Sequence, residues 1–228
     1  MGVDLVIRGR QVPKGIVRVS GAKNSATRLL AAALVAQEPV HLWNFPTELV
    51  DVKRKAEFIS ELGASVQLDS GSESCEIRVP DLFPERVKCR SLPVRTTYLL
   101  AAGQLARKGI AYVPYPGGCR IGERGYDLHL MIWERLGCSI TESENHIEIR
   151  GHLTAGEIEF PFFTVGGTEN ALISASVAKG TTVIRNAYIS PEVRDLIGFL
   201  GDLGAHIEVH GNSLVVVRGA GGLLRGAS

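Results

Sequence analysis

The chain has 228 residues, of which 45% are hydrophobic and 21% charged, as in a globular protein long enough for one large domain or two small ones. Its 25 lysines and arginines and 24 acidic residues leave a formal charge of +1, which argues against nucleic acid as a partner. The longest apolar stretch, residues 29–36, is far shorter than the ~20 residues of a membrane-spanning helix, so no membrane partner is expected.

Residues 1–20 precede any repeated pattern. They contain two strand-like runs, at residues 5–7 and 15–20. The first residues show no basic segment followed by an apolar run, so no secretory signal is predicted.

Three copies of one unit follow in chain order, and each begins with an apolar helix. These helices are predicted at residues 26–36, 94–105 and 169–177. Each leads to a strand, predicted at residues 39–43, 109–112 and 181–185. An amphipathic helix comes next, at residues 52–62, 126–136 and 191–203. Two strands around a polar turn close the units, at residues 65–68 and 75–79, 139–141 and 146–150, and 206–209 and 213–217.

A Leu-Gly step ends each amphipathic helix, with the glycine at position 63, 137 or 204. Glycine there suits a helix C-cap, which requires left-handed φ. Because helices that are hydrophobic all round must be buried, the three apolar helices are expected to pack together at the centre with sheets outside. Self-similarity at a period of roughly 70 residues indicates repeated supersecondary units with one core. The sequence therefore predicts an α/β protein of the α+β type, an αβ prism with threefold pseudosymmetry.

The four cysteines, at positions 75, 89, 119 and 138, form no CxxC pair and no cysteine–histidine array with zinc spacing. We therefore expect no metal site and a reduced, cytoplasmic setting. Cys75, Cys89 and Cys138 are expected to be thiols packed in or beside strands.

Cys119 differs from the other three because it lies on a glycine-rich turn, residues 116–124. Arg120 and Arg124 follow it closely. Nearby cations lower the pKa of a thiol and bind phosphate or carboxylate, so this turn suits an anionic substrate. Taken alone, the same residues also fit a surface turn with an inert cysteine.

Two further cations stand where apolar helices begin. Residues 20–24 (Ser-Gly-Ala-Lys-Asn) lie at a strand-to-helix junction, where free N–H groups and the helix dipole favour an anion. Lys23 adds a charge suited to phosphate, although by itself it is read as a solvated helix-start lysine. Arg95 opens the second apolar helix, and a charge there requires a partner or a ligand. An ordinary salt bridge is the alternative for Arg95.

Together these motifs resemble the enolpyruvyl transferases, in particular the branch that acts on UDP-N-acetylglucosamine. The matching segments come in family order, at residues 20–24, 116–124, 127–129 and 165–170. The resemblance implies two domains, each built of three βαβαββ units, with the active site in the cleft between them. A typical member is close to twice this length, so the chain resembles the N-terminal half.

This resemblance divides the chain into three parts. Residues 1–20 would be strands that pack with the other domain, residues 21–218 the three-repeat domain, and residues 219–228 a glycine-rich linker toward a missing C-terminal half. The implied reaction moves the enolpyruvyl group from phosphoenolpyruvate to the 3′-hydroxyl of UDP-N-acetylglucosamine and releases phosphate, in peptidoglycan precursor synthesis. It requires no metal and no organic cofactor.

The resemblance implies that Cys119 and Lys23 are catalytic. Cys119 would act in acid/base work or in covalent capture of phosphoenolpyruvate, and it would be the target of the epoxide antibiotic fosfomycin. Lys23 would bind phosphoenolpyruvate, together with Arg95 and Arg124. Asn24 would be a hydrogen-bond partner of the sugar.

The remaining implied contacts are to the nucleotide. Residues 125–128, which include Asp127 and Leu128, would hold the uracil, largely through backbone groups. His129 would lie near the ligand as a further substrate-binding residue, although read from its sequence alone it is a hydrogen-bonded structural histidine. Residues 164–166 (Thr164, Val165 and Gly166) would cradle the diphosphate.

Two features depart from the family pattern or stay outside it. Phe162 falls where some members carry a lysine that contacts the diphosphate, which leaves room for another acceptor nucleotide. Arg120 occupies a variable position and is read as incidental, and the family's general base belongs to the other half. Glu169 and Asn170 are read as residues that cap and open the third apolar helix.

Two alternatives to the implied function stay open: an enolpyruvyl transferase with another acceptor such as UMP, and a non-catalytic nucleotide-sugar-binding paralogue.

Overall fold

The computed structural model describes residues 14–80, 95–115 and 125–227, a few isolated positions before residue 14, and the backbone alone at residues 95 and 96. The first unit contains α1 (Lys23–Ala32), the 3₁₀ helix η1 (Ala33–Val35), β1 (Val40–Leu42), α2 (Val50–Glu61), β2 (Ser65–Asp69) and β3 (Ser74–Arg78). The second contains the 3₁₀ helix η2 (Arg95–Leu100), α3 (Ala101–Lys108), β4 (Ile110–Pro114), α4 (Asp127–Arg135), β5 (Ser139–Glu142) and β6 (His146–Arg150). The third contains β7 (Glu157–Thr164), α5 (Val165–Val177), β8 (Lys179–Ala187), α6 (Pro191–Asp202), β9 (His206–His210) and β10 (Leu214–Ala220).

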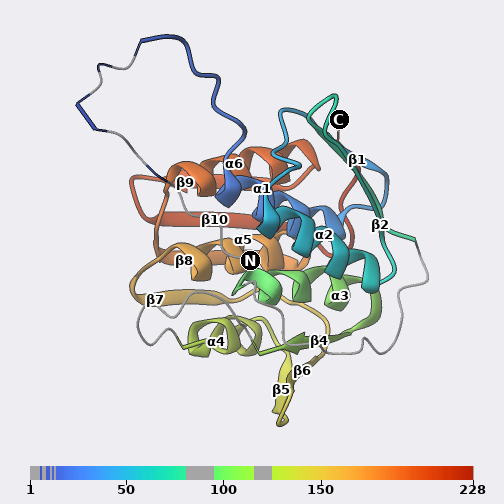
Figure 1. Ribbon diagram of the computed structural model, residues 1–228. Coiled ribbons are helices and arrows are strands. Elements are labelled where there is room, and N and C mark those ends of the chain that lie inside the picture. Colours follow the sequence, from blue (N-terminus) through green and yellow to red (C-terminus); the bar gives the residue numbers. More distant parts are fainter. Residues whose placement is uncertain are drawn as a thin grey trace.

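Each unit contributes one sheet to the outside of the molecule, and α1, α3 and α5 lie in the middle (Figure 1). The first two sheets are antiparallel, with strand orders β1-β3-β2 and β4-β6-β5. The third has the order β7-β8-β10-β9, and its β7 runs parallel to β8. The third unit therefore has the complete βαβαββ order, and the described parts of the other two have the order αβαββ. The predicted prism is confirmed.

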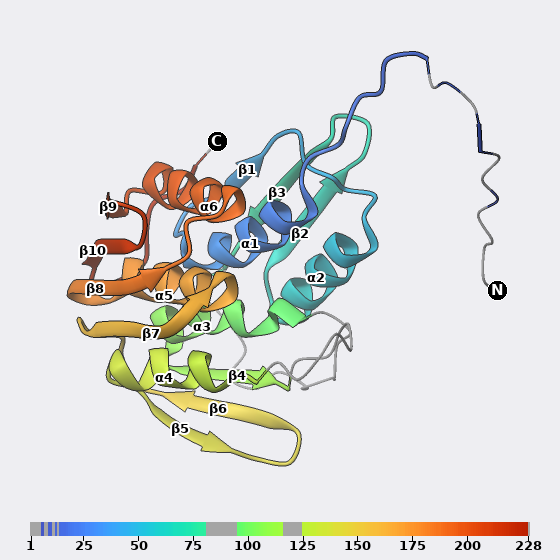
Figure 2. The same ribbon diagram turned by 90° about the vertical axis from the view of Figure 1, so that its left-hand side faces the viewer.

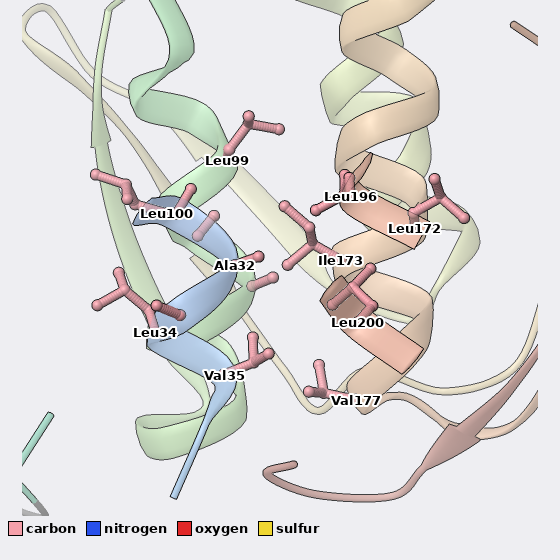
Figure 3. Close-up of a cluster of buried hydrophobic side chains, with 14 of the residues drawn as sticks. Ala32, Leu34, Val35, Leu99, Leu100, Leu172, Ile173, Val177, Leu196 and Leu200 are labelled. Carbon is pink, nitrogen blue, oxygen red and sulfur yellow. The ribbon is translucent and has the colours of Figure 1, made fainter. Parts of the chain in front are cut away.

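Apolar contacts between the central helices hold the three units together. Helix α5 is the most enclosed, because residues 167–177 are all buried. Figure 3 shows Ile173 of α5 on the side that faces Ala32 and Val35 of the first unit. Full burial of a large aliphatic side chain contributes roughly 1.5–3 kcal/mol, so this cluster is a main source of stability. Among the described helices, none is both long and apolar enough to cross a membrane.

The three Leu-Gly steps end α2, α4 and α6 in the same way. Gly63, Gly137 and Gly204 have φ of 101°, 88° and 97°. In each cap the glycine N–H donates to the carbonyl three residues earlier, and the next N–H donates to the carbonyl five residues earlier. This pair of hydrogen bonds is the Schellman motif, which requires left-handed φ at the glycine. The predicted C-caps are confirmed in all three units.

Strand β7 is the element that the sequence prediction omits. Its inward side chains alternate only at Ile158 and Phe160 before Pro161 interrupts the pattern. The register against β8 also shifts between Glu159 and Thr164. So short an alternation is a weak signal of a strand.

The beginning of the described chain differs from the expected strand at residues 15–20. These residues form no strand in the structure. Ile16, Val17 and Val19 are exposed, each with more than 80% of its surface accessible. A run of apolar residues with no neighbouring strand therefore leads into α1.

The tail at residues 219–227, predicted to be a linker toward a C-terminal half, is packed against the first unit. Leu224 is buried, and its backbone forms a parallel bridge with Ala36. The N–H of His41 in β1 donates to the carbonyl of Ala227 at 2.9 Å. The tail thus covers the edge of the first sheet, beside the first strand of that unit, as β7 lies beside β8 in the third.

Candidate active site

Helix η2 contacts both α1 and α5, and the N-terminal ends of all three face toward the right in Figure 2. Arg28 in α1 and Glu169 in α5 form an ion pair at 2.7 Å, which joins these two helices. Tyr98 in η2 lies beside Gly166 in α5. Because free N–H groups and the positive ends of helix dipoles gather here, this end of the molecule favours anionic ligands.

The segment predicted to cradle a diphosphate is the start of α5. Thr164 is the N-cap, and its hydroxyl accepts a hydrogen bond from the Gly167 N–H at 3.2 Å. A Cβ atom on Gly166 would lie 2.8 Å from the Tyr98 hydroxyl, so a larger residue would require Tyr98 or α5 to shift. The first turn of α5 holds no acidic side chain. Val165 and Gly166 therefore lie in a helix turn that carries no carboxylate of its own.

The segment predicted to hold uracil is the first turn of α4. Asp127 is exposed, Leu128 is half-buried and His129 is buried. The His129 ring stacks on Tyr98 with ring centroids 3.6 Å apart, so this ring contact accounts for part of its burial. Because Tyr98 also lies beside Gly166, the segments predicted for uracil and diphosphate are neighbours in the structure.

Two tyrosines lie among the described residues on either side of the glycine-rich segment 116–124. Tyr115 and Tyr126 lie on either side of residues 116–124, with ring centroids 5.4 Å apart. Both hydroxyls donate to the same Glu142 oxygen, at 3.4 and 2.8 Å. The hydrogen bond to this carboxylate raises the pKa of Tyr126 to about 12. The chain therefore enters and leaves this segment at one place, next to the first turn of α4.

Three of the predicted site residues lie wholly or partly outside the description. Cys119 and Arg124, with their neighbour Arg120, belong to the undescribed segment 116–124. Arg95 is described only as the backbone residue that begins η2. Their roles stay predictions.

Lys23 begins α1, as predicted, and its ammonium has a partner at the surface. Its Nζ lies 2.6 Å from Oδ2 of Asp51 in α2. The two side chains are 56% and 39% exposed, so solvent screens the pair. An anionic ligand at this helix terminus would compete with Asp51 for Lys23.

A buried charged cluster lies beneath this end of the molecule, and the sequence prediction missed it. The cluster consists of Arg28, Lys55 and Glu169. Lys55 is 1% exposed. Burial lowers the pKa of Lys55 well below its usual value and the Arg28 charge lowers it further, whereas Glu169 opposes the change. Burial also raises the pKa of Glu169, against the effect of Arg28.

Glu169 corrects an interpretation made from the sequence. It was expected to cap or open the third helix, but Thr164 is the N-cap and Glu169 is fully buried one turn later. A signal was present in the sequence at Lys55, which stands between Val52 and Ala56 on the apolar face of α2. A charge at such a position requires a buried partner.

Exposed aromatic rings border the start of α5. Phe162 and Phe163 are each 62% exposed at the end of β7. The shifted register of β7 accompanies Asn186, whose φ is 57° and whose side chain donates to the Phe160 carbonyl at 2.8 Å. Such bulges redirect side chains. Phe162, which falls where some family members carry a lysine, thus places an exposed ring two residues before Thr164.

Two of the remaining thiols are packed as expected. Cys75 and Cys138 are buried and free. Burial raises the pKa of Cys75 to about 12 and that of Cys138 to about 11, so both are poor nucleophiles. Cys89 lies outside the described residues. Across the described ranges, no group of three or more His, Cys, Asp or Glu side chains is arranged to hold a metal ion.

Comparison with known proteins agrees with this architecture. The family model of EPSP synthase (3-phosphoshikimate 1-carboxyvinyltransferase) matches residues 7–227. The UDP-N-acetylglucosamine 1-carboxyvinyltransferase of Maricaulis maris is 39% identical over 223 residues, which cover 94% of this chain and 51% of that protein. Its counterpart in Nitratidesulfovibrio vulgaris is 41% identical over 216 residues, with the same two coverages.

Solved structures show the same fold at lower identity. The enolpyruvyl transferase NikO from Streptomyces tendae matches with a TM-score of 0.74 and 24% identity, over 94% of this chain and 51% of that one. EPSP synthase from Acinetobacter baumannii matches with a TM-score of 0.73 and 18% identity, over 93% and 48%. The chain spans about half the length of the curated relatives it matches. By its sequence and its fold, the chain belongs to the EPSP synthase family.

Proposed function

We propose that this chain supplies one half of the active site of an enzyme that transfers the enolpyruvyl group from phosphoenolpyruvate to the 3′-hydroxyl of UDP-N-acetylglucosamine, with release of phosphate. Such a reaction belongs to peptidoglycan precursor synthesis, and so to cell-wall growth, shape and division. The observation that carries the proposal is the position of the start of α5, which lies beside η2 and the first turn of α4 at the end of the molecule that the start of α1 also faces. Relatives at 39% and 41% identity, named for this activity, support it.

The geometry fits two anionic ligands. The backbone donors at Val165 and Gly166 suit the diphosphate, and the adjacent turn at Asp127 suits the base. Lys23 at the start of α1 suits the phosphate of phosphoenolpyruvate. In the proposed reaction the methylene carbon of phosphoenolpyruvate takes up a proton while the sugar hydroxyl attacks the neighbouring carbon. The tetrahedral intermediate then loses phosphate, with Cys119 in acid/base or covalent work.

Binding and turnover test the proposal separately. Calorimetry on the 228-residue chain is expected to show UDP-N-acetylglucosamine binding, whereas phosphate release stays slow until a C-terminal half from a relative is added. Binding without phosphate release, even with that half present, would instead support the non-catalytic paralogue. A chain that alone matches the rate of a full-length relative would contradict the assignment of one half of the site.

The proposed thiol chemistry has its own test. Cys119→Asp, assayed together with the C-terminal half, is expected to keep part of the activity and to escape fosfomycin. Full inhibition of this variant by fosfomycin would refute alkylation of Cys119. Mass spectrometry of the wild-type chain after exposure provides the matching control, because only the peptide with Cys119 is expected to gain the mass of the inhibitor.

A second acceptor is favoured by one observation, the exposed ring of Phe162 near the start of α5. The chain has no lysine there to contact a diphosphate, so a nucleotide with a single phosphate is the alternative. Comparing phosphate release with UDP-N-acetylglucosamine and with UMP distinguishes the two acceptors. We also propose a cytoplasmic location, which the free, buried thiols of Cys75 and Cys138 support.

A further inference from the structure

Arg28 lies at the centre of a hydrogen-bond network at the start of α1. Its side chain is 13% exposed, and its Nε donates to Oε1 of the fully buried Glu169 at 2.7 Å. Its Nη1 lies 3.0 Å from the Thr27 hydroxyl and 3.4 Å from Oδ1 of Asn24. One guanidinium therefore connects a buried carboxylate in α5 to an exposed amide in the first turn of α1.

Each hydrogen bond in this network has a defined direction. The Thr27 hydroxyl lies 3.2 Å from the carbonyls of Lys23 and Asn24, to which it donates. It must then accept from Arg28, because a guanidinium has donors and no acceptor. The same rule fixes the Asn24 amide, since only its oxygen can face Arg28. The amide NH₂ group of Asn24 therefore points away from Arg28.

We propose that Arg28, held by Glu169, is a positioning residue that fixes Asn24 as a hydrogen-bond donor toward the ligand. This inference rests on the proposed function and on the contact between Asn24 and the sugar that the sequence resemblance implies. A donor at this point selects a ligand with an oxygen acceptor, such as a hydroxyl or the carbonyl of an acetylated amine. An ammonium group, which only donates, does not fit.

The test measures how much the sugar adds to nucleotide binding. Calorimetry gives the dissociation constants of UDP and of UDP-N-acetylglucosamine for the 228-residue chain, and their ratio is the sugar increment. Arg28→Lys keeps a positive charge against Glu169, but one ammonium cannot hold Asn24 as well. In Arg28→Lys the sugar increment is expected to fall roughly two- to tenfold, because binding must then order the free side chain of Asn24. The affinity for UDP is expected to stay unchanged.

Two further variants separate positioning from support of the fold. Asn24→Ala is expected to lower the increment by itself, and Arg28→Lys is expected to add nothing in the Asn24→Ala background. Arg78→Lys is the matched control, because Arg78 pairs with Glu76 on the outer sheet, in β3. It is expected to leave both dissociation constants unchanged.

Any other result overturns either the proposed function or the positioning role of Arg28. If wild type binds neither ligand, or binds both equally, the proposed function fails and this inference fails with it. If wild type discriminates and Arg28→Lys discriminates equally well, the inference fails and the proposed function stands. If Arg28→Lys weakens both ligands by the same factor, Arg28 only supports the fold and the positioning role is excluded.

Discussion

The starts of α1 and α5 face the same end of the molecule but are built from different groups. Helix α1 begins with Lys23, a surface ammonium paired with Asp51 at 2.6 Å. Helix α5 begins with the Thr164 cap and two glycines, and its carboxylate, Glu169, is buried one turn further in. Salt screens an exposed side-chain charge, whereas backbone donors are fixed by the fold. The two ends are therefore expected to differ in their response to substitution and to salt.

The largest expected difference is between two carboxylates: Glu169, near the start of α5, and Asp51, which pairs with Lys23 at the start of α1. Glu169→Ala removes the buried carboxylate that pairs with Arg28, and it is expected to lower the free energy of unfolding by about 3–5 kcal/mol. Asp51→Ala removes the exposed partner of Lys23 and is expected to cost about 1 kcal/mol or less. Urea unfolding followed by circular dichroism measures both. Equal losses would contradict a buried Arg28–Glu169 pair in solution.

The next largest effect concerns the close approach at the start of α5. Gly166→Ala places a Cβ against the Tyr98 hydroxyl, 2.8 Å away, so it is expected to cost about 1–3 kcal/mol of stability and to weaken UDP binding. Gly198 in α6 is the control, because a Cβ there meets nothing within 4 Å. Gly198→Ala is expected to stabilise the chain by about 0.5–1 kcal/mol. Similar results for both glycines would show that α5 can shift away from η2.

A smaller effect is expected from a lysine placed near the start of α5, which would match Lys23 at the start of α1. Phe162→Lys places an ammonium near the Thr164 cap, where it would attract the phosphates of UDP, and is expected to strengthen UDP binding roughly two- to fivefold at low salt. The gain is expected to disappear at high salt, because the added charge is exposed. Uridine, which carries no phosphate, serves as the control ligand and is expected to bind both proteins equally. A gain for uridine would show that the ring of Phe162, and not the charge, determines binding.

The smallest effect is expected at the α1 end. Asp51→Asn frees the Lys23 ammonium while it keeps the size of the side chain, so affinity for phosphoenolpyruvate is expected to rise by about twofold. Calorimetry at two salt concentrations measures the change and its screening. Unchanged affinity at low salt would indicate that Lys23 does not face the ligand.

Local patterns in the sequence were sufficient to predict most of this fold. The Leu-Gly steps predicted three helix ends, and the glycines at positions 63, 137 and 204 have the expected left-handed φ. The segment that contains Lys23 was correctly predicted to begin a helix, whereas α5 begins at Val165, four residues before the predicted start at Glu169. In each case the signal lies within one turn or one strand, where periodicity and capping chemistry act.

The missed features depend on contacts between distant residues. Arg28 and Glu169 are 141 positions apart, and neither position alone indicates which partner it meets. The tail behaves similarly, because the buried Leu224 pairs with Ala36 inside a glycine-rich stretch that looks like a linker. Strand β7 was missed for a local reason, since Pro161 interrupts its alternation. Tertiary contacts set the ion pair and the packing of the tail, so a pattern in one segment could not predict them, whereas β7 has too short an alternation of its own.

The tail that covers the first sheet has a practical consequence for trimmed versions of this domain. A chain cut before Leu224 would lose the carbonyl that accepts from the Gln37 N–H at 2.7 Å, along with the partner of His41 in β1. Unpaired strand edges recruit strands from other molecules and promote aggregation. Expression variants that retain residues through 227 are therefore expected to stay dispersed at concentrations where shorter ones precipitate.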